Sequence, residues 1–599
     1  MMHNAVTANY QSNFNDSNEQ IKRYEILINR FSILRLLLIA AGIFFFYQSL
    51  KLDGTWLPVL VFFVVILIFS LLVRKQNFFE SKRSYFRHLS QVNSNEIESI
   101  NRRGNMYSDG SAWNDDLHPY TSDLDIFGKG SLFELLNRCA TDIGKTKLAG
   151  WLKEKAPAQE IGERQHAVEE LASKRYWKQN LQTVLLFSNE TATDHVQKLF
   201  QYMRTLPANR TNLVWLYLKW SPWIFLLSAI GAWFFPAVIL AIIALGITNL
   251  LFMQAYQPVV MKTDSLIGKM SKILGHFSEA ITSISEEKWE SELCRQLAFE
   301  LKNEEKGKLP EQVRRLSVLI NLLSLGLSPI GSVLNVIMPW NVRQFFAIED
   351  WKKANQVNLE SAFDVIANFE ALISLSSLRT NYPHWVFPDI IESVKFTLTA
   401  KAIGHPLISP EFRVANDYSL TNELKIDIIT GSNMAGKSTF LRTLGINSVL
   451  AFSGAPVCAE KMEVSPMLIF CYMRIRDSLN ENTSTFKAEL DRLQNLLEIL
   501  QAEGKVFFLI DEMLRGTNSV DKYLGSKAVI EKLISQKAVG IIATHDLQIA
   551  ELEQKYPSYI RNFYFDIQIE GADMKFDYKL KEGKCKTFNA SLLLKRLGI

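Results

Sequence analysis

One short run of residues supplies the groups needed to bind a triphosphate. Residues 431–438 read GSNMAGKS and fit the pattern G-x-x-x-x-G-K-[ST], in which a glycine-rich backbone wraps phosphate oxygens. Lys437 would reach the β and γ phosphates, and Ser438 would hold Mg²⁺. An ordinary glycine-containing loop is the alternative interpretation. The residues predicted to contact the nucleotide here are Gly431, Ser432, Asn433, Met434, Ala435, Gly436, Lys437, Ser438 and Thr439.

Two carboxylates and a histidine follow two further apolar runs. Residues 505–512 read KVFFLIDE, so Asp511 and Glu512 end a predicted buried strand. We expect Asp511 to bind Mg²⁺, and Glu512 to orient or deprotonate the attacking water, because a carboxylate beside the metal can accept that proton. Residues 538–544 read AVGIIAT and lead into His545, which would lie near the γ-phosphate. A histidine after a strand is more often structural, and that alternative stays open.

The elements that must position these groups are those of an α/β nucleotide-binding fold. Residues 424–430 (LKIDIIT) are typical of a buried strand, and residues 438–447 can open a helix whose first N–H groups face the phosphates. The carboxyl ends of parallel strands meet at one edge of a sheet. We therefore expect Lys437, Glu512 and His545 to lie together as the catalytic residues of a P-loop nucleotide hydrolase.

The C-terminal third of the chain contains four ordered motifs. They read ITGSNMAGKST, STFKAE, DEMLRGT and ATH, at residues 429–439, 484–489, 511–517 and 543–545. Together they resemble the ATPase domain of the MutS family of DNA mismatch repair proteins, whose motifs are T-G-P-N-M-x-G-K-S-T, S-T-F-x-x-E, D-E-x-x-R-G-T and A-T-H. The resemblance covers about residues 395–599. Ser432 stands where the family usually has proline, which should alter loop stiffness rather than chemistry.

This resemblance implies a specific cofactor set and assembly. ATP would be the nucleotide and Mg²⁺ the metal, and Ser484 would complete the nucleotide site of a partner subunit, so that a homodimer holds two composite sites. The residues alone leave open that 478–485 (SLNENTST) is a polar loop. An ABC transporter would need an L-S-G-G-Q-like signature, and residues 460–505 contain none. The resemblance extends more weakly to residues 127–152 and 349–383, which look like the start of the family's helical core and the long helix leading into its ATPase domain.

The amino-acid composition says more about the cellular compartment of the protein than about its function. The 599 residues suggest about four domains. A net charge of +4 is too small to indicate nucleic-acid binding by itself. The five cysteines are scattered without a C-x-x-C pair, which argues for reduced cytosolic thiols and against a zinc site.

Apolar runs predict two transmembrane hairpins. Residues 32–50 and 56–73 flank a short link, and residues 216–235 and 236–253 form a second pair. Each run is close to the roughly 18–20 residues needed to cross a bilayer. For both pairs, a buried helical hairpin in a large soluble protein is the alternative. A further apolar stretch, residues 321–340, is broken by glycine and proline, and we expect it to be buried in the core.

Basic residues flank both predicted hairpins on each side. They are Lys22, Arg23, Arg30, Arg74, Lys75, Lys82, Arg83, Arg204, Arg210, Lys262, Lys269 and Lys272. Cytoplasmic flanks of membrane helices carry an excess of lysine and arginine. We therefore expect a protein integral to the cytoplasmic membrane, with the ATPase domain in the cytosol.

These signals predict an all-α core with two transmembrane helical hairpins. An α/β P-loop ATPase domain follows, which is ABC-type and MutS-like. We expect a polar N-terminal tail at residues 1–30, the first hairpin at 31–75 and the first part of the helical core at 76–212. The second hairpin follows at 213–256, then the second part of the core with its lever at 257–393 and the ATPase domain at 394–599.

The function stays open between two main classes. The resemblance favours an ATPase dimer coupled to DNA in mismatch repair or recombination. Mismatch-recognising members carry a Phe-x-Glu motif in a dedicated domain, and we interpret the two matches here, at residues 78–80 and 277–279, as chance. The hairpins and the missing recognition domain favour an ATP-driven membrane motor that does not bind DNA. A transporter is disfavoured, because the spans contain almost no central ionisable groups.

Overall fold

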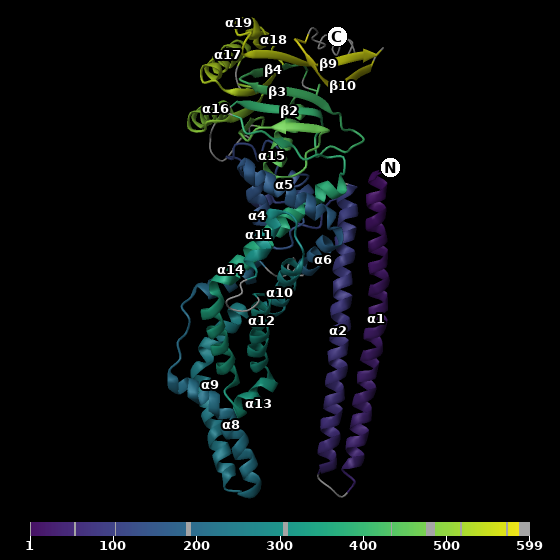
Figure 1. Cartoon of the computed structure of the whole chain (residues 1–599), viewed down its shortest axis with the longest axis vertical. Helices are drawn as coiled ribbons and strands as arrows, with labels where there is room; N and C mark the ends of the chain where they lie inside the picture. Colours follow the sequence, from purple (N-terminus) through teal and green to yellow (C-terminus); the bar gives the residue numbers. More distant parts are fainter. Residues whose placement is uncertain are drawn as a thin grey trace.

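The structure is a computed structural model. It describes residues 2–52, 56–101, 104–186, 193–302, 309–393, 395–432, 434–474, 485–515, 518–570 and 573–585. Figure 1 shows an α/β region at one end of the long axis, a helical region below it, and two helical hairpins that extend to the opposite end. The α/β region and the tips of both hairpins therefore lie at opposite ends of the molecule.

The first hairpin consists of α1 (Met2–Ser49) and α2 (Trp56–Ile100), which run side by side (Figure 1). Aromatic rings hold them together: Tyr24 stacks on Phe86 at 5.8 Å, and Phe31 meets Phe79 edge-on at 5.3 Å between centroids. The described part of residues 1–30, which we expect to be a polar N-terminal tail, belongs to α1 and buries Tyr10 and Ile28.

The second hairpin consists of α8 (Asn212–Phe234) and α9 (Val238–Ile267). By length and composition, five helices in the described ranges are able to cross a membrane, four of them in the two hairpins. In those four, at most 11% of the most apolar window is buried inside the protein, whereas the fifth, Leu359–Asn381, is 83% buried. The hairpin helices thus expose their apolar side chains, and the fifth belongs to the protein core.

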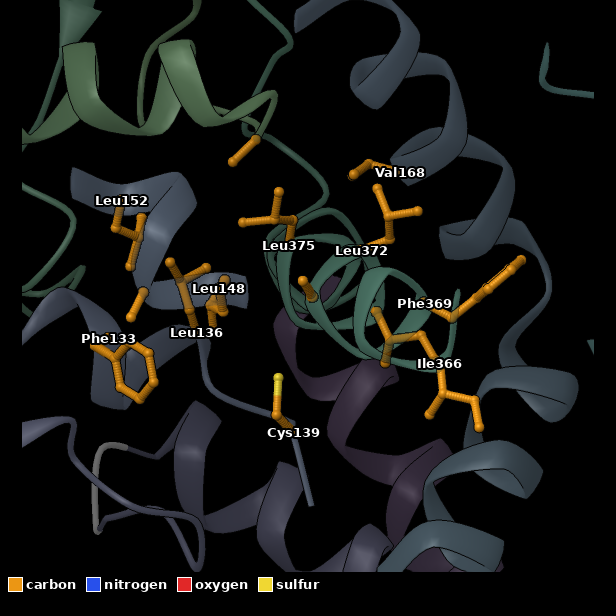
Figure 2. Close-up of a cluster of buried hydrophobic side chains, with 14 of the residues drawn as sticks. Phe133, Leu136, Cys139, Leu148, Leu152, Val168, Ile366, Phe369, Leu372 and Leu375 are labelled. Atoms are coloured by element: carbon orange, nitrogen blue, oxygen red, sulfur yellow. The ribbon is translucent and has the colours of Figure 1, made fainter. Parts of the chain in front are cut away.

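The remaining helices form the helical region. They are α3 (Leu132–Leu136), α4 (Asp142–Lys153), α5 (Ala158–Ser173), α6 (Arg175–Leu185), α7 (Thr193–Arg204), α10 (Met270–Glu286), α11 (Glu292–Glu300), α12 (Leu309–Gly326), α13 (Pro329–Ile337) and α14 (Trp340–Asn381), with a 3₁₀ turn at Ser111–Trp113. The C-terminal half of α14 packs against α4 and α5. Figure 2 shows this core, in which Leu148 and Val168 face Ile366, Phe369 and Leu372 from α14.

Residues 321–340 depart in part from the expected burial. Leu323 and Asn335 are buried, but Leu325, Leu327 and Val333 are exposed. The reason is a sharp bend: α12 and α13 meet at 91°, and the apolar side chains on the outside of this corner stay exposed.

The α/β region contains two sheets. A four-stranded sheet has the order β1-β5-β2-β3, and a six-stranded sheet has the order β10-β9-β4-β8-β7-β6. The strands are β1 (Asp389–Ile390), β2 (Phe396–Ile403), β3 (Asn416–Glu423), β4 (Ile426–Thr430), β5 (Lys461–Val464), β6 (Leu468–Tyr472), β7 (Val506–Asp511), β8 (Val539–Thr544), β9 (Ile560–Glu570) and β10 (Asp573–Glu582). The helices are α15 (Lys437–Ser453), α16 (Thr485–Ala502), α17 (Ser519–Ser535), α18 (Leu547–Ala550) and α19 (Leu552–Lys555).

The central strands occupy the three segments that the apolar runs predict. β4, β8 and β7 are adjacent and parallel, and every residue in them is buried. Strands buried on both faces read as continuous apolar runs, which is why they stand out in the sequence. β6 and β9 extend this parallel set on either side, and β10 adds an antiparallel edge.

Candidate functional site

The loop after β4 adopts a backbone that requires glycine at two positions. Gly431 has φ 145°, and a Cβ there would lie 2.7 Å from the carbonyl oxygen of Phe565. Gly436 has φ 103° and caps the start of α15 in the left-handed region. Side chains are disfavoured at both positions, so the glycines of the motif allow the chain to turn tightly into the helix.

Lys437 is held inside this loop. It is the first residue of α15, its side chain is 2% exposed, and its Nζ donates to the carbonyl oxygens of Gly431 at 2.6 Å and Ser432 at 2.8 Å. Burial lowers the pKa of Lys437, and the negative charges of Glu512 and Asp511 act in the opposite direction. The ammonium group is therefore a buried cation, near two carboxylates, at the start of a helix.

Sheet order brings the other predicted groups to the same edge. Thr430 at the end of β4 pairs with Thr544 at the end of β8, and Asp511 at the end of β7 pairs with Ala543. His545 follows β8, so it lies between the loop that carries Lys437 and the strand that ends in Asp511. The three predicted strand ends are thus adjacent.

Glu512 and His545 are in direct contact. Nδ1 of His545 lies 2.8 Å from Oε1 of Glu512, and because an ionised carboxylate only accepts hydrogen bonds, Nδ1 is the donor. Burial opposes ionisation of Glu512, but the hydrogen bond from His545 and the charges of His545 and Arg515 outweigh it and hold the pKa of Glu512 below its usual value. Glu512 is therefore an ionised, oriented carboxylate.

The backbone after β7 is strained. Glu512 and Leu514 have φ values of 58° and 56°, in the left-handed region that non-glycine residues rarely adopt. The buried carboxylate of Glu489 on α16 accepts hydrogen bonds from the backbone N–H of Arg515, the shorter at 3.0 Å. Strain of this kind persists only where surrounding contacts enforce it, and it is common at active sites.

The donor set at this edge fits a nucleotide with its metal. The loop offers N–H groups at the start of α15, a buried ammonium group, and the buried hydroxyl oxygen of Ser432, which makes no hydrogen bond within the described part of the protein. Asp511 supplies a largely buried carboxylate next to this loop. Phosphate oxygens match the N–H groups and the ammonium, and carboxylate and hydroxyl oxygens match Mg²⁺.

Some predicted site residues cannot be placed. Asn433 and Ser484, together with Gly516 and Thr517 of the third motif, lie outside the described residues. Met434 is exposed at the outer face of the loop, whereas Ala435 is buried beneath it.

The structure adds residues that sequence reasoning missed. The segment 117–125 of the helical region lies against the α/β region, where Asp125 contacts Arg442 on α15 at 3.2 Å and Arg474, just after β6, at 2.6 Å. Asp123 accepts the backbone N–H of Arg474 at 2.7 Å. These two aspartates thus join the helix of the phosphate loop to the last residue before segment 475–484.

The same segment covers the edge of the six-stranded sheet. The backbone N–H of Cys471 on β6 donates to the carbonyl oxygen of Pro119 at 2.8 Å, and Arg492 on α16 donates to the carbonyl oxygens of His118 and Pro119. Nothing in the polar sequence around Asp125 distinguishes it from an ordinary loop, because its partners are more than 300 residues away.

Comparison with known proteins gives one family match. The family model for MutS domain V matches residues 427–591, the segment that contains the glycine-rich loop, Asp511, Glu512 and His545.

Individual relatives extend the similarity toward the N-terminus. The chain is 27% identical over 486 residues to the DNA mismatch repair protein MutS of Thermotoga maritima, covering 76% of this chain and 59% of that protein. It is 35% identical over 209 residues to the DNA mismatch repair protein MutS of Aquifex pyrophilus, and 31% identical over 239 residues to the human MutS protein homolog 4. These two matches cover 34% and 38% of this chain, and 24% and 25% of the relatives. The chain therefore matches less than two thirds of the length of any of these three relatives.

Proposed function

Because the chain belongs to the MutS family, we propose that it is a membrane-anchored ATPase that works as a homodimer and couples ATP hydrolysis to DNA binding. The observation that carries the proposal is the convergence of Lys437, Asp511, Glu512 and His545 at one edge of the central sheet. MutS relatives support a role related to mismatch repair.

We assign the site residues as follows. Lys437 and the N–H groups of residues 431–439 bind the β and γ phosphates of ATP. Ser438 and Asp511 hold Mg²⁺, which supplies charge neutralisation at the phosphates when bound. Glu512 orients the attacking water and accepts its proton, and an ionised carboxylate suits that role. His545 keeps the Glu512 carboxylate in place through the 2.8 Å hydrogen bond.

The dimer follows from the family's signature segment. Ser484 would reach the nucleotide site of a second copy, so that two copies form two composite sites. Arg474 precedes this segment, and both Asp123 and Asp125 bond Arg474. ATP binding would then close the dimer, and hydrolysis would reopen it.

Membrane anchoring is supported by the exposed apolar surface of both hairpins. The exposed residues include Leu36, Phe45, Phe63 and Leu67 in the first, and Leu227 in the second. The tips of both hairpins lie at the same end of the molecule, so one bilayer could receive both (Figure 1). Basic residues on both sides of each hairpin favour cytosolic flanks.

These assignments imply a domain organisation. Residues 31–75 and 213–256 are the membrane hairpins, residues 76–212 and 257–393 form the helical core, and residues 394–599 form the ATPase domain. α2 continues from the first hairpin into the core without a break. The hairpin and the core are therefore mechanically connected, and we propose that the core transmits the motion of the ATPase dimer.

A second function is favoured by one specific observation. The apolar hairpin tips extend furthest from the α/β region, so a bilayer would occupy the space around the ends of the helical arms (Figure 1). In this alternative, the same ATPase drives a conformational change at the membrane and does not bind DNA.

The test is the ATPase rate of the full-length protein in lipid nanodiscs, with and without homoduplex, mismatched or branched DNA. Under the primary proposal, one form of DNA stimulates turnover, and the stimulation falls steeply with salt because phosphate contacts release counterions. A rate that none of the three changes would favour the membrane motor. Failure to hydrolyse ATP at all would contradict both.

A further inference from the structure

The bend between α12 and α13 is a polar-lined turn with an apolar outer face. Residues 316–342 contain no ionisable side chain, and exposed arginines stand at both ends of this stretch. Val333 is 62% exposed, and Leu325, Leu327 and Val336 are also exposed. We call these four residues the corner patch.

Two asparagine side chains, those of Asn335 and Asn249, form hydrogen bonds with backbone groups around the bend. Asn335, which is 1% exposed, donates to the carbonyl oxygens of Gly331 at 2.9 Å and Gly326 at 3.2 Å, and it accepts the N–H of Asn341. Asn249 on α9 donates to the carbonyl oxygens of Val336 and Ile337 at 2.9 and 3.0 Å. Non-helical backbone is tolerated at membrane depth only where such internal partners exist.

The bend is attached to the second hairpin. A Cβ at Gly246 of α9 would lie 3.3 Å from Val336, so the two helices approach closely, and the Tyr217 hydroxyl on α8 donates to Asn249 at 2.5 Å. Asn249 lies about 16 Å along the axis from the start of α9, and Tyr217 lies about 25 Å from the end of α8. In a hydrocarbon core of about 30 Å, Tyr217 falls in the half nearest the ATPase domain, whereas Asn249 and the nearby Gly246 fall near the middle.

Side chains on α8 mark the surface of the bilayer on the side of the ATPase domain. Lys219 directs its ammonium group back over the ring of Trp215 at 4.9 Å, away from the hairpin tip. Lysines extend toward the membrane surface in this way, and tryptophans collect there. Exposed Arg315 before the bend and Arg343 after it are the corresponding basic residues of the corner.

We propose that the α12–α13 corner enters the bilayer from the cytosolic side beside α9 and reaches about its middle, with the corner patch against the acyl chains. α13 is about 14 Å long, too short to cross the membrane, so the corner enters and leaves on the same side. The inference rests on the proposed membrane insertion of the α8–α9 hairpin. We assign lipid acyl chains as the partner of the corner patch, because the patch is uncharged, has an arginine on either side in the sequence and continues the apolar surface of that hairpin.

This insertion gives α14 a fixed point at the membrane. α14 begins directly after α13, runs about 63 Å and ends at Asn381, whose side chain bonds Glu96 of α2 at 2.7 Å and Tyr10 of α1 at 3.0 Å. One helix thus connects the inserted corner to the base of the first hairpin, next to the α/β region.

Depth-dependent quenching tests the inference. In a Cys585→Ser background, where the four remaining cysteines are buried, single cysteines replace Val333 or Val336 and carry a bimane label. The full-length protein is placed in phosphatidylcholine–phosphatidylglycerol vesicles that contain lipids with a nitroxide at a shallow or a deep acyl carbon. Leu227→Cys, in the half of α8 nearer the hairpin tip, is the membrane control, and exposed Leu117→Cys is the aqueous control.

We expect labels at positions 333 and 336 to be quenched. Val336→Cys should respond more to the deep nitroxide, as Leu227→Cys does, because it lies beside Gly246 near the middle of the bilayer, while Leu117→Cys should respond to neither. The ATPase rate of each variant confirms folding. If Leu227→Cys is quenched and both corner labels are not, the corner inference is wrong and the membrane hairpin stands. If none is quenched, the proposed anchoring itself fails. Disulfide cross-linking of Val333→Cys between copies, without lipid quenching, would assign the patch to a protein interface and overturn the inference.

Discussion

Asp125, in a loop of the helical region, forms an ion pair with Arg442 on the helix that follows the phosphate loop, at 3.2 Å. The same carboxylate contacts Arg474, the last described residue before the segment that contains Ser484. One side chain therefore links the helix proposed to bind the nucleotide, α15, to the residue that precedes the segment proposed to act on the partner subunit.

Asp125→Asn should reduce the ATPase rate more than it reduces stability. Both arginines are partly exposed, so the pair contributes about 1 kcal/mol or less to folding. A loss of about 1 kcal/mol in positioning would slow turnover about fivefold. The measurements are kcat, affinity for a fluorescent ATP analogue and Tm. The matched control is Asp116→Asn, an exposed residue that bonds Ser122 in the same loop. Equal effects of both variants on kcat would argue against a positioning role for Asp125.

Glu512→Gln should retain ATP binding and lose turnover. The substitution keeps shape but removes the carboxylate that His545 orients, and loss of a general base costs about 10²–10⁴-fold in rate. Single-turnover hydrolysis and size-exclusion chromatography with ATP would show slow chemistry and an accumulated closed dimer. Glu503→Gln, at the exposed end of α16, should behave as the wild type. A Glu512→Gln protein that hydrolyses ATP normally would disprove the assignment.

Lys437→Ala should weaken nucleotide binding by about 10- to 100-fold, because a charged hydrogen-bond donor contributes about 1.5–3 kcal/mol. Isothermal titration with ATP and Mg²⁺ measures this directly. Lys532→Ala, on the exposed face of α17, is the matched control and should leave the affinity unchanged. Unchanged affinity in Lys437→Ala would remove this residue from the site.

Glu96 and Arg138 form a buried ion pair at the base of the first hairpin, joined by Asn381 of α14. Burial alone would raise the pKa of Glu96, but the charge and hydrogen bonds of Arg138 outweigh it and hold the pKa below its usual value. Glu96→Gln leaves a buried guanidinium group unpaired and should cost about 3–5 kcal/mol. Thermal unfolding in detergent measures the loss.

The pH dependence of the same pair has a definite sign. Since the folded state depresses the pKa of Glu96, the stabilisation is present above the usual carboxylate pKa and is lost as the pH falls through the folded value. Tm should therefore fall on acidification, and less so in Glu96→Gln. Glu292→Gln removes an exposed pair with Arg295 and should change Tm little at any pH. A Glu96→Gln protein as stable as the Glu292→Gln control would contradict the role of the pair.

The first hairpin should cross the bilayer fully. A cysteine at exposed Lys51, next to the hairpin tip, should react with a membrane-impermeant maleimide only from the face opposite the ATPase domain. Leu117→Cys should react only from the ATPase face. Reaction of both positions from one face would show that the hairpin does not span the membrane.

Much of the proposed nucleotide site can be predicted from the sequence, because its groups follow strands that local sequence patterns reveal. β4, β7 and β8 are continuous apolar runs, and the glycine-rich loop, Asp511–Glu512 and His545 each follow one of them. Parallel strands place their carboxyl ends at one edge, so chain order alone predicts that these groups meet. The exposed apolar hairpins are visible for a similar reason, since length and hydropathy are local properties.

The remaining features depend on contacts between residues far apart in the chain. Residues 2–30 look like a polar tail because their few apolar side chains acquire a partner only when α2 folds back along them. Asp125 acquires its role only when its loop meets Arg442, 317 positions later. The corner patch is exposed because α12 and α13 bend at 91° around Asn335 and Asn249. Local sequence determined the elements and the chemistry at the strand ends, whereas only the tertiary structure decided which distant polar groups pair and which apolar faces stay uncovered.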